Sequence, residues 1–181
     1  MVTVLLLLLA TLAMMMVMAR TGAPLVTTDT PWGILHLELT FSHQCTLETL
    51  SHWKKNSAGA DLIQIAKINT WLDYIFLIFY SLFFYYACRL SIPAGKLTGT
   101  TTTAHQVARA GLLAGLLDVV ENLGMMISLY NKGNSIVSIA TAVAASAKWL
   151  LVILVILFLL FKFFKAFYHW IGTLMVTGTL K

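Results

Sequence analysis

The sequence predicts an all-α integral membrane protein, a four-helix bundle with an extramembrane loop between its first two spans. The chain of 181 residues is 59% hydrophobic and 10% charged, with a mean hydropathy of +0.85. Soluble domains contain about 25% charged residues on average. Four apolar stretches reach the length of roughly 20 residues that a helix needs to cross a bilayer. We therefore expect residues 1–181 to form a single membrane domain.

The four predicted spans cover residues 2–19, 70–88, 108–130 and 135–160, which leaves an outer loop at 20–69 and an interfacial tail at 161–181. The first span has an alternative reading as a secretory signal peptide. It lacks a basic n-region and exceeds the apolar core of about 7 to 15 residues that such peptides have, so we expect a retained spanning helix. Only residues 131–134 separate the last two spans, and so short a connection makes these helices antiparallel neighbours.

The outer loop is expected to contain a short amphipathic helix. This helix begins at Ser42 or Thr46 and ends at Asn56, and it places Leu47, Leu50 and Trp53 on one side. The charged residues of the segment lie elsewhere on the helix, so its apolar side can cover the bundle.

Two segments flank that helix. Residues 33–39 alternate apolar and polar side chains, which is the period of a half-buried strand. No second strand is expected to pair with it, so the segment should lie extended or helical across the mouth of the bundle. Asp61 is placed to cap the next helix, which should run through Lys67 into the second span without a break.

The basic residues indicate how the chain is oriented. Loop 89–109 and tail 161–181 each contain three basic residues and no acidic residue, whereas the outer loop balances four basic against four acidic residues. Cytoplasmic loops of membrane proteins carry the excess of Lys and Arg. Both termini are therefore expected in the cytoplasm. The aromatic and basic tail is expected to lie on the membrane surface, with docking to a partner as the alternative.

Polar side chains inside the third predicted span form a stripe. It consists of Gly111, Gly115, Asp118 and Asn122, which recur at helical spacing. Glu121 lies beside this stripe. Small residues allow a neighbouring helix to approach closely. Ionisable residues within spans are costly and usually face the interior of the bundle or a wet cavity, so the stripe predicts a functional site.

The fourth predicted span has a matching stripe of small and polar residues, Ser138, Thr141, Ala145 and Lys148. Counted outward from the turn, Lys148 is level with Asp118, which predicts a buried ion pair. Such a pair can fix the register of two helices without any further role, and we expect this structural role for it. Glu121 is then left without a basic partner, which makes it a candidate to hold a proton at neutral pH.

A polar pocket beneath the outer loop is the sharper hypothesis. Asp73 lies about one turn inside the second span, in the half of the membrane that Glu121 also approaches. Alternatively, Asp73 lies at the wet interface, where acids near helix ends reach headgroup water. The candidate ligand-binding residues are His36, Glu38, Trp53, Asp73, Tyr80, Asp118, Glu121 and Asn122, and the candidates for a catalytic role are Asp73 and Glu121.

The same residues carry a resemblance. Glu38, Trp53, Asp73 and Tyr80, followed by the D-x-x-E-N element at 118–122, occur in an order that resembles a family of small uncharacterised bacterial four-span membrane proteins. The resemblance covers about residues 33–130. It implies that these polar residues belong together and that the protein lies in a bacterial inner membrane, and it implies no activity.

Several classes of function are not expected. The five histidines are dispersed and lack the spacing of a zinc helix such as H-E-x-x-H, so no metal site is predicted. P-loop, dinucleotide-binding and G-x-S-x-G motifs are absent from the sequence, and no cofactor is expected. The basic residues flank apolar segments, which is typical of membrane-orienting charges and not of nucleic-acid binding.

Three functions are compatible with these features. The first is a non-catalytic protein that binds an apolar or lipid-like ligand, or a partner helix, at the acidic pocket. The second is a small membrane enzyme or proton-coupled carrier that uses Asp73 and Glu121. The third is an accessory subunit of a larger membrane complex. The expected partners are membrane lipid, a small apolar ligand, and another membrane protein or a second copy of this chain.

Overall fold

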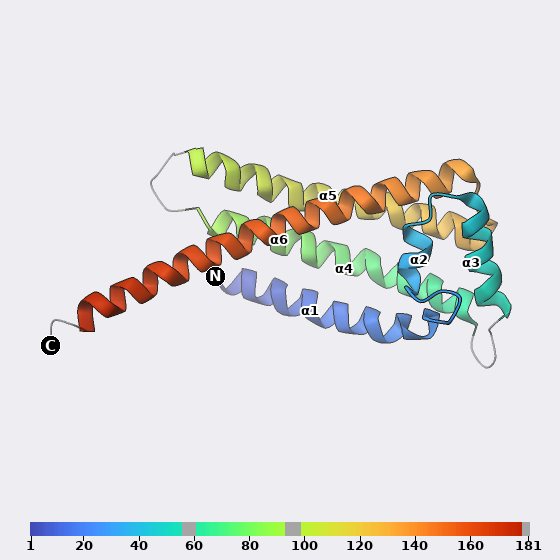
Figure 1. The fold of residues 1–181 in the computed structure, drawn as a ribbon, viewed down its shortest axis with the longest axis horizontal. Helices are drawn as coiled ribbons and strands as arrows, with labels where there is room; N and C mark the ends of the chain where they lie inside the picture. Colours follow the sequence, from blue (N-terminus) through green and yellow to red (C-terminus); the bar gives the residue numbers. More distant parts are fainter. Residues whose placement is uncertain (56–60, 93–98, 179–181) are drawn as a thin grey trace.

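Four long helices make up most of the molecule (Figure 1). The computed structural model describes residues 1–55, 61–92 and 99–178. The long helices are α1 (Val2–Gly22), α4 (Leu62–Leu90), α5 (Gly99–Asn131) and α6 (Ser135–Gly178). The segment between α1 and α4 contains the 3-10 helix η1 (Ala23–Leu25), α2 (Ile34–Glu38) and α3 (His43–Lys55). These described ranges contain no strand.

The predicted all-α membrane bundle is confirmed. Each of the four long helices is long and apolar enough to cross a membrane, with mean hydropathies from 1.4 to 2.7. Helix α1 leads away from the end of the bundle that carries the N-terminus, α4 returns to that end, α5 leads away again and α6 returns. The two termini therefore lie at the same end, and α2 and α3 lie at the other (Figure 1). The expected helix in the outer loop is present as α3.

The turn between α5 and α6 makes these helices antiparallel neighbours, as the short connection predicts. Lys132 and Gly133 adopt positive φ angles of 63° and 62°, which reverse the chain direction. The side chain of Asn134 then caps α6, since its Oδ1 accepts a hydrogen bond of 2.9 Å from the backbone N–H of Val137.

Glycines set how closely α5 packs against its neighbours. A Cβ at Gly115 would lie 2.9 Å from Cβ of Ser81 on α4, and one at Gly111 would lie 2.8 Å from Cβ of Phe84. On the other side, a Cβ at Gly124 would overlap the hydroxyl of Thr141 on α6. Gly111 and Gly115 of the stripe therefore let α4 approach α5 closely, and Gly124 does the same for α6.

Helix α1 lies at the edge of the bundle. It has no buried residue and packs mainly on α4 (Figure 1). Asn69 of α4 holds its end, because the side-chain Nδ2 donates to the carbonyl oxygen of Met18 at 3.0 Å and to Oγ1 of Thr21 at 2.9 Å. The exposed apolar side chains of α1 are suited to contact lipid.

The outer loop folds over one end of the bundle. The indole Nε1 of Trp53 donates to the carbonyl oxygen of Leu25 at 3.2 Å and to Oγ1 of Thr30 at 3.1 Å, which ties α3 to the segment after α1. Thr46 of α3 shares a hydrogen bond of 2.9 Å with Ser138 of α6. These contacts seat the loop on α6 as well as on the end of α1.

Of the two conformations expected for residues 33–39, the structure shows the helical one. The strand-like alternation is wrong as an indication of strand here, because α2 satisfies its own backbone hydrogen bonds and needs no partner strand. Asp61 caps α4 as expected, accepting a hydrogen bond of 3.1 Å from the backbone N–H of Gln64, and α4 runs unbroken through Lys67.

Helix α6 is much longer than its predicted span. Its 44 residues extend over about 66 Å, whereas the hydrocarbon core of a bilayer is about 30 Å thick. The segment predicted as an interfacial tail continues α6 to Gly178 and projects beyond the bundle (Figure 1). The last part of that predicted tail, residues 179–181, lies outside the described residues.

Two apolar clusters fill the interior. The outer cluster lies under the loop and includes Leu25, Leu37, Trp53 and Met125. The inner cluster lies toward the termini and includes Tyr80, Phe84, Ala114 and Val155. Polar side chains gather between these clusters.

Candidate functional site

Four carboxyl groups and one ammonium group meet inside the bundle, and we call this set the acidic cluster. It consists of Glu38 from α2, Asp73 from α4, Asp118 and Glu121 from α5, and Lys148 from α6. Their exposed fractions range from 0% to 7%. The side chains that donate hydrogen bonds into the cluster include Tyr80 and Asn122.

Lys148 bridges two of the carboxyl groups. Its Nζ lies 3.1 Å from Oδ1 of Asp118, so the contact expected between these two residues is present. The same Nζ lies 2.9 Å from Oε1 and 2.8 Å from Oε2 of Glu121. The expectation that α6 offers nothing to Glu121 is wrong, because residues three apart on a helix share a face and an ammonium group has three donors.

The remaining oxygen of Asp118 binds α4. The hydroxyl of Tyr80 donates to Oδ2 of Asp118 at 2.8 Å. Beside it, Nδ2 of Asn122 donates to Oδ2 of Asp73 at 2.7 Å. The stripe on α5 thus binds polar side chains of α4 and of α6 at one level of the bundle.

Glu38 enters the cluster from the outer loop. Its carboxyl group interacts with the side chains of Lys148, Glu121 and Trp149. Burial is the main influence on this carboxyl group and raises its pKa from the ordinary value of 4.5, because the ionised form loses its hydration. Two buried carboxyl groups repel each other when both are ionised, and a proton on one of them relieves this repulsion.

Trp149 is a site residue that the sequence analysis missed. Its ring centroid lies 5.3 Å from Nζ of Lys148, and its side chain is 41% exposed. Its position next to Lys148 in the sequence could have indicated that it lies near the cluster. Adjacent residues on a helix point about 100° apart, however, so the neighbour of a buried residue is not itself expected in the same cluster.

The cluster lies deep in the bundle. Asp118 is 13 residues before the end of α5 and Lys148 is 13 residues after the start of α6, so both lie about 20 Å from the turn between these helices. Asp73 is 11 residues after the start of α4. The alternative placement of Asp73 at a wet interface does not fit this structure, because only 7% of the residue is exposed.

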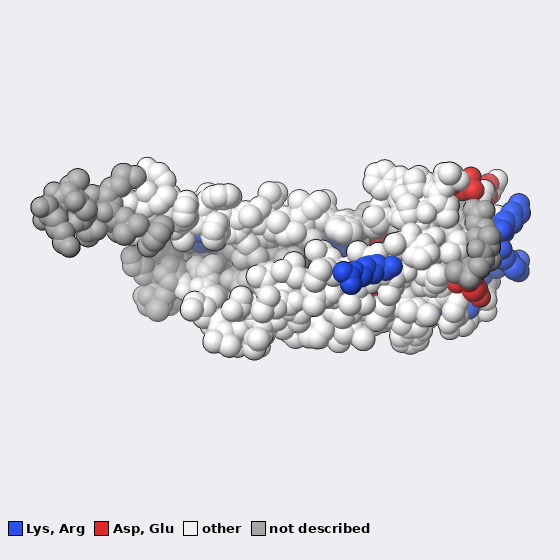
Figure 2. Space-filling view, turned by 90° about the horizontal axis from the view of Figure 1, so that it is seen from below, with Lys and Arg blue, Asp and Glu red and all other residues white. Residues whose placement is uncertain are grey.

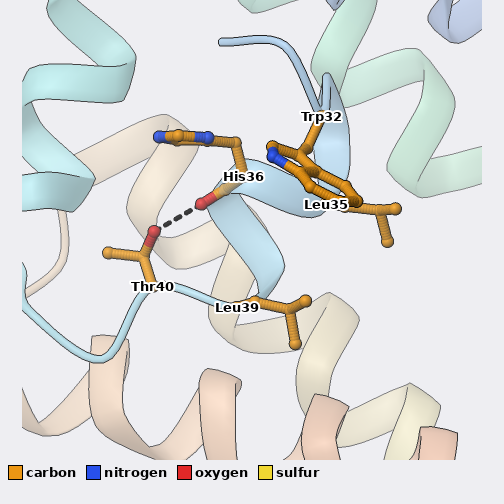
Figure 3. A pocket seen from close by; sticks show the side chains of 5 residues that line it. All are labelled: Trp32, Leu35, His36, Leu39 and Thr40. Carbon is orange, nitrogen blue, oxygen red and sulfur yellow. Dashed lines mark hydrogen bonds between the residues drawn. The ribbon is translucent and has the colours of Figure 1, made fainter.

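His36 and Trp53 do not join the cluster. Figure 3 shows the side chain of His36 at a hollow that it lines with Trp32, Leu35, Leu39 and Thr40, and the volume of this hollow is about 310 Å³. The dashed line there marks the hydroxyl of Thr40 donating to the backbone oxygen of His36. Trp53 is fully buried and its indole nitrogen is engaged by Leu25 and Thr30. Both residues shape the loop that positions Glu38.

The surface of the molecule agrees with a membrane location. Figure 2 shows Lys, Arg, Asp and Glu atoms gathered at the end that carries α3, and white side chains over most of the length. The same face is hollowed lengthwise, and small areas of red and blue show at the bottom of the hollow at mid-length (Figure 2).

Some hydrogen-bond acceptors of the cluster have no donor. In the part of the chain that the structure describes, Oε2 of Glu38 and Oδ1 of Asn122 are buried oxygens without a hydrogen-bond partner. Each such buried group costs free energy, about 1 to 3 kcal/mol. The cluster is therefore rich in acceptors and poor in donors.

No group of three or more His, Cys, Asp and Glu side chains in residues 1–55, 61–92 and 99–178 is arranged to hold a metal ion. The carboxyl groups instead bind Lys148, Tyr80 and Asn122. Protons and hydrogen-bond donors are species that this geometry suits.

No family model, curated protein sequence or solved structure matches this chain.

Proposed function

We propose that this integral membrane protein is a proton-coupled carrier, which binds and releases protons at the acidic cluster as it binds a ligand from the lipid phase. The observation that carries the proposal is the surplus of carboxyl groups. Four carboxyl groups surround the single ammonium group of Lys148, and all five residues are at least nine-tenths buried. An unpaired buried charge costs several kcal/mol, so protons are the least costly way to balance the surplus.

The hydrogen bonds provide a path for these protons. Glu38 contacts Glu121, Glu121 contacts Lys148, Lys148 contacts Asp118, and Asp118 accepts from Tyr80, so the groups form one continuous chain. The chain begins on α2 in the outer loop and ends in the bundle. Asp73 and Glu121 are the proposed proton acceptors. Glu121 is part of this chain, whereas Asp73 lies beside it and accepts a hydrogen bond from Asn122.

The path is closed at its inner end. Tyr80 belongs to the inner apolar cluster, together with Phe84 and Val155, and these side chains separate the acidic cluster from the terminal end of the bundle. Among the described residues, protons that enter from the outer loop therefore meet this apolar cluster on the side of the termini. Such a closed site favours coupling of a proton to a bound ligand over steady conduction of protons.

Infrared difference spectroscopy tests the proton binding directly, because protonated and ionised carboxyl groups absorb at different frequencies. The purified protein in lipid nanodiscs should show a protonated carboxyl band at neutral pH that is lost at alkaline pH. Asp73→Asn and Glu121→Gln should each reduce the band, whereas Glu48→Gln, at an exposed acid on α3, should leave it unchanged. A band that is absent at neutral pH, or identical in all variants, would contradict the proposal.

We also propose that the protein lies in a bacterial inner membrane with both termini in the cytoplasm. The proposal is supported by the bias of basic residues toward the loop 89–109 and the tail, and by the placement of both termini at one end of the bundle. The native cysteines allow a test, since Cys45 is exposed on α3 and Cys88 is buried. A membrane-impermeant maleimide added to intact spheroplasts should label the wild type but not Cys45→Ser. Labelling only after permeabilisation would reverse the orientation.

A further inference from the structure

The unpartnered oxygens of the acidic cluster define what it lacks. Glu38 is 7% exposed and Asn122 is fully buried, yet Oε2 of Glu38 and Oδ1 of Asn122 have no partner in the described residues. The neighbouring donors are already engaged, since Lys148 binds Asp118 and Glu121, and Tyr80 binds Asp118. A ligand that completes this site must therefore donate hydrogen bonds.

The charge of the cluster points in the same direction. The carboxyl groups come from α2, α4 and α5, and among the described residues only Lys148 on α6 forms an ion pair with them. Tyr80 and Tyr74 of α4 are the other titratable side chains whose interactions reach these carboxyl groups. A positively charged ligand group can therefore take the place of a proton without leaving the site with excess charge.

The position of the cluster indicates the rest of the ligand. The cluster lies about 20 Å below the turn between α5 and α6, at the depth of the lipid chains. Side chains other than Lys, Arg, Asp and Glu cover most of the length of the molecule on the face shown in Figure 2. A ligand that reaches this point from the bilayer needs an apolar tail.

We propose that the acidic cluster binds the protonated amino group of an amine-bearing amphiphile and releases a proton in exchange. This inference rests on the proposed proton-binding function and adds the class of ligand. The exchange is balanced: the ammonium group R–NH3⁺ enters, one carboxyl O–H bond is broken, and the proton leaves, so the net charge of the site is unchanged. The N–H groups of the ligand donate to Glu38 and Asn122.

The test uses dodecylammonium as the probe, with the protein in lipid nanodiscs and empty nanodiscs as the baseline. Calorimetry in buffers of different ionisation enthalpy reports both binding and proton release. We expect saturable binding with release of about one proton per bound molecule. Dodecyltrimethylammonium has the same charge and tail but no N–H group, and it should bind at least about tenfold weaker, because a hydrogen bond to a charged group contributes about 1.5 to 3 kcal/mol.

Variants and controls separate the possible outcomes. Glu38→Gln should reduce dodecylammonium binding and proton release, and Glu48→Gln should change neither. Equal binding of the trimethyl compound, or of dodecanol without proton release, would overturn the inference, since the tail or charge alone would then explain binding. If the carboxyl band titrates as proposed but dodecylammonium does not bind, the ligand class is wrong and the proton-binding function stands. If the carboxyl band is also absent, the result contradicts both the ligand class and the proton-binding function.

Discussion

Asp118 and Glu121 lie three residues apart on α5, and this spacing lets the ammonium group of Lys148 serve both. The depth of each residue could be predicted by counting from the short turn, so the contact of Lys148 with Asp118 was expected. The contact of Lys148 with Glu121 was not expected, because assigning one acidic partner to each basic residue ignores the three donors of an ammonium group. Glu38 could be named from the sequence but not placed, since its position depends on a five-residue helix that only tertiary contacts hold.

Glu38 should make the stability of the protein dependent on pH. Burial raises its pKa above the ordinary value of 4.5, so the folded protein keeps the proton at pH values where the unfolded chain has lost it. The contribution of Glu38 is thus fully present below its unfolded pKa and is lost as the pH rises through the folded pKa. In Glu38→Gln the thermal unfolding midpoint in detergent should fall less steeply across this range.

Glu48→Gln is the matched control for that measurement, because Glu48 is exposed on α3. Its unfolding midpoint should follow the wild type at every pH. If the wild type and Glu38→Gln have the same slope, the folded protein does not hold a proton on Glu38 over this pH range.

At the scale of elements, the spanning helices could be predicted well and the outer loop less so. A span must satisfy its own backbone hydrogen bonds in lipid, so hydropathy and length are sufficient to find it. Helix α2 has five residues and an alternating pattern that equally suits a strand. Its conformation is decided by contacts with α3, α5 and α6 that no local pattern contains.

Close packing of α5 against α4 predicts a cost for any side chain at Gly115. Gly115→Ala would place a methyl group 2.9 Å from Cβ of Ser81, so the helices must separate, and we expect a loss of about 1 to 3 kcal/mol in the free energy of unfolding. The loss can be measured by reversible unfolding in mixed micelles. Because the methyl group disturbs the helix that carries Asp118, the protonated carboxyl band should also shift.

A second substitution on α4 checks the cause of that loss. Ser81→Gly removes the atom that the new methyl group meets, so the double variant should regain part of the stability, although a helical glycine itself costs about 1 kcal/mol. A double variant that is less stable than the sum of the two single changes would show that Gly115 matters for a reason other than its contact with Ser81.

The acidic cluster lies as a polar layer between the two apolar clusters of the molecule. The residues that border this layer differ between the side of the outer loop and the side of the termini. Toward the outer loop, Glu38 connects the layer to α2, whereas toward the termini the inner cluster follows directly after Tyr80. The sequence predicted a pocket open to the outer side, since Asp73 and Glu121 share that half of the membrane. The closure at the other side depends on side chains from α4, α5 and α6 together, so no single helix pattern could indicate it.

This asymmetry predicts that the resting protein does not leak protons and that a change in the inner cluster makes it do so. Val155 is fully buried there, seven residues beyond Lys148 and on the same face of α6. In proteoliposomes with an imposed pH gradient and an internal pH dye, the wild type should match empty liposomes, and Val155→Asn should dissipate the gradient several-fold faster, because its amide lets water reach Tyr80. Ile156→Asn is the control, because Ile156 is 42% exposed. Proteoliposomes with this variant should hold the pH gradient as the wild type does, provided that its thermal unfolding midpoint shows that it folds. A wild type that leaks as fast as Val155→Asn would mean that the relay passes through the membrane and that the protein conducts protons.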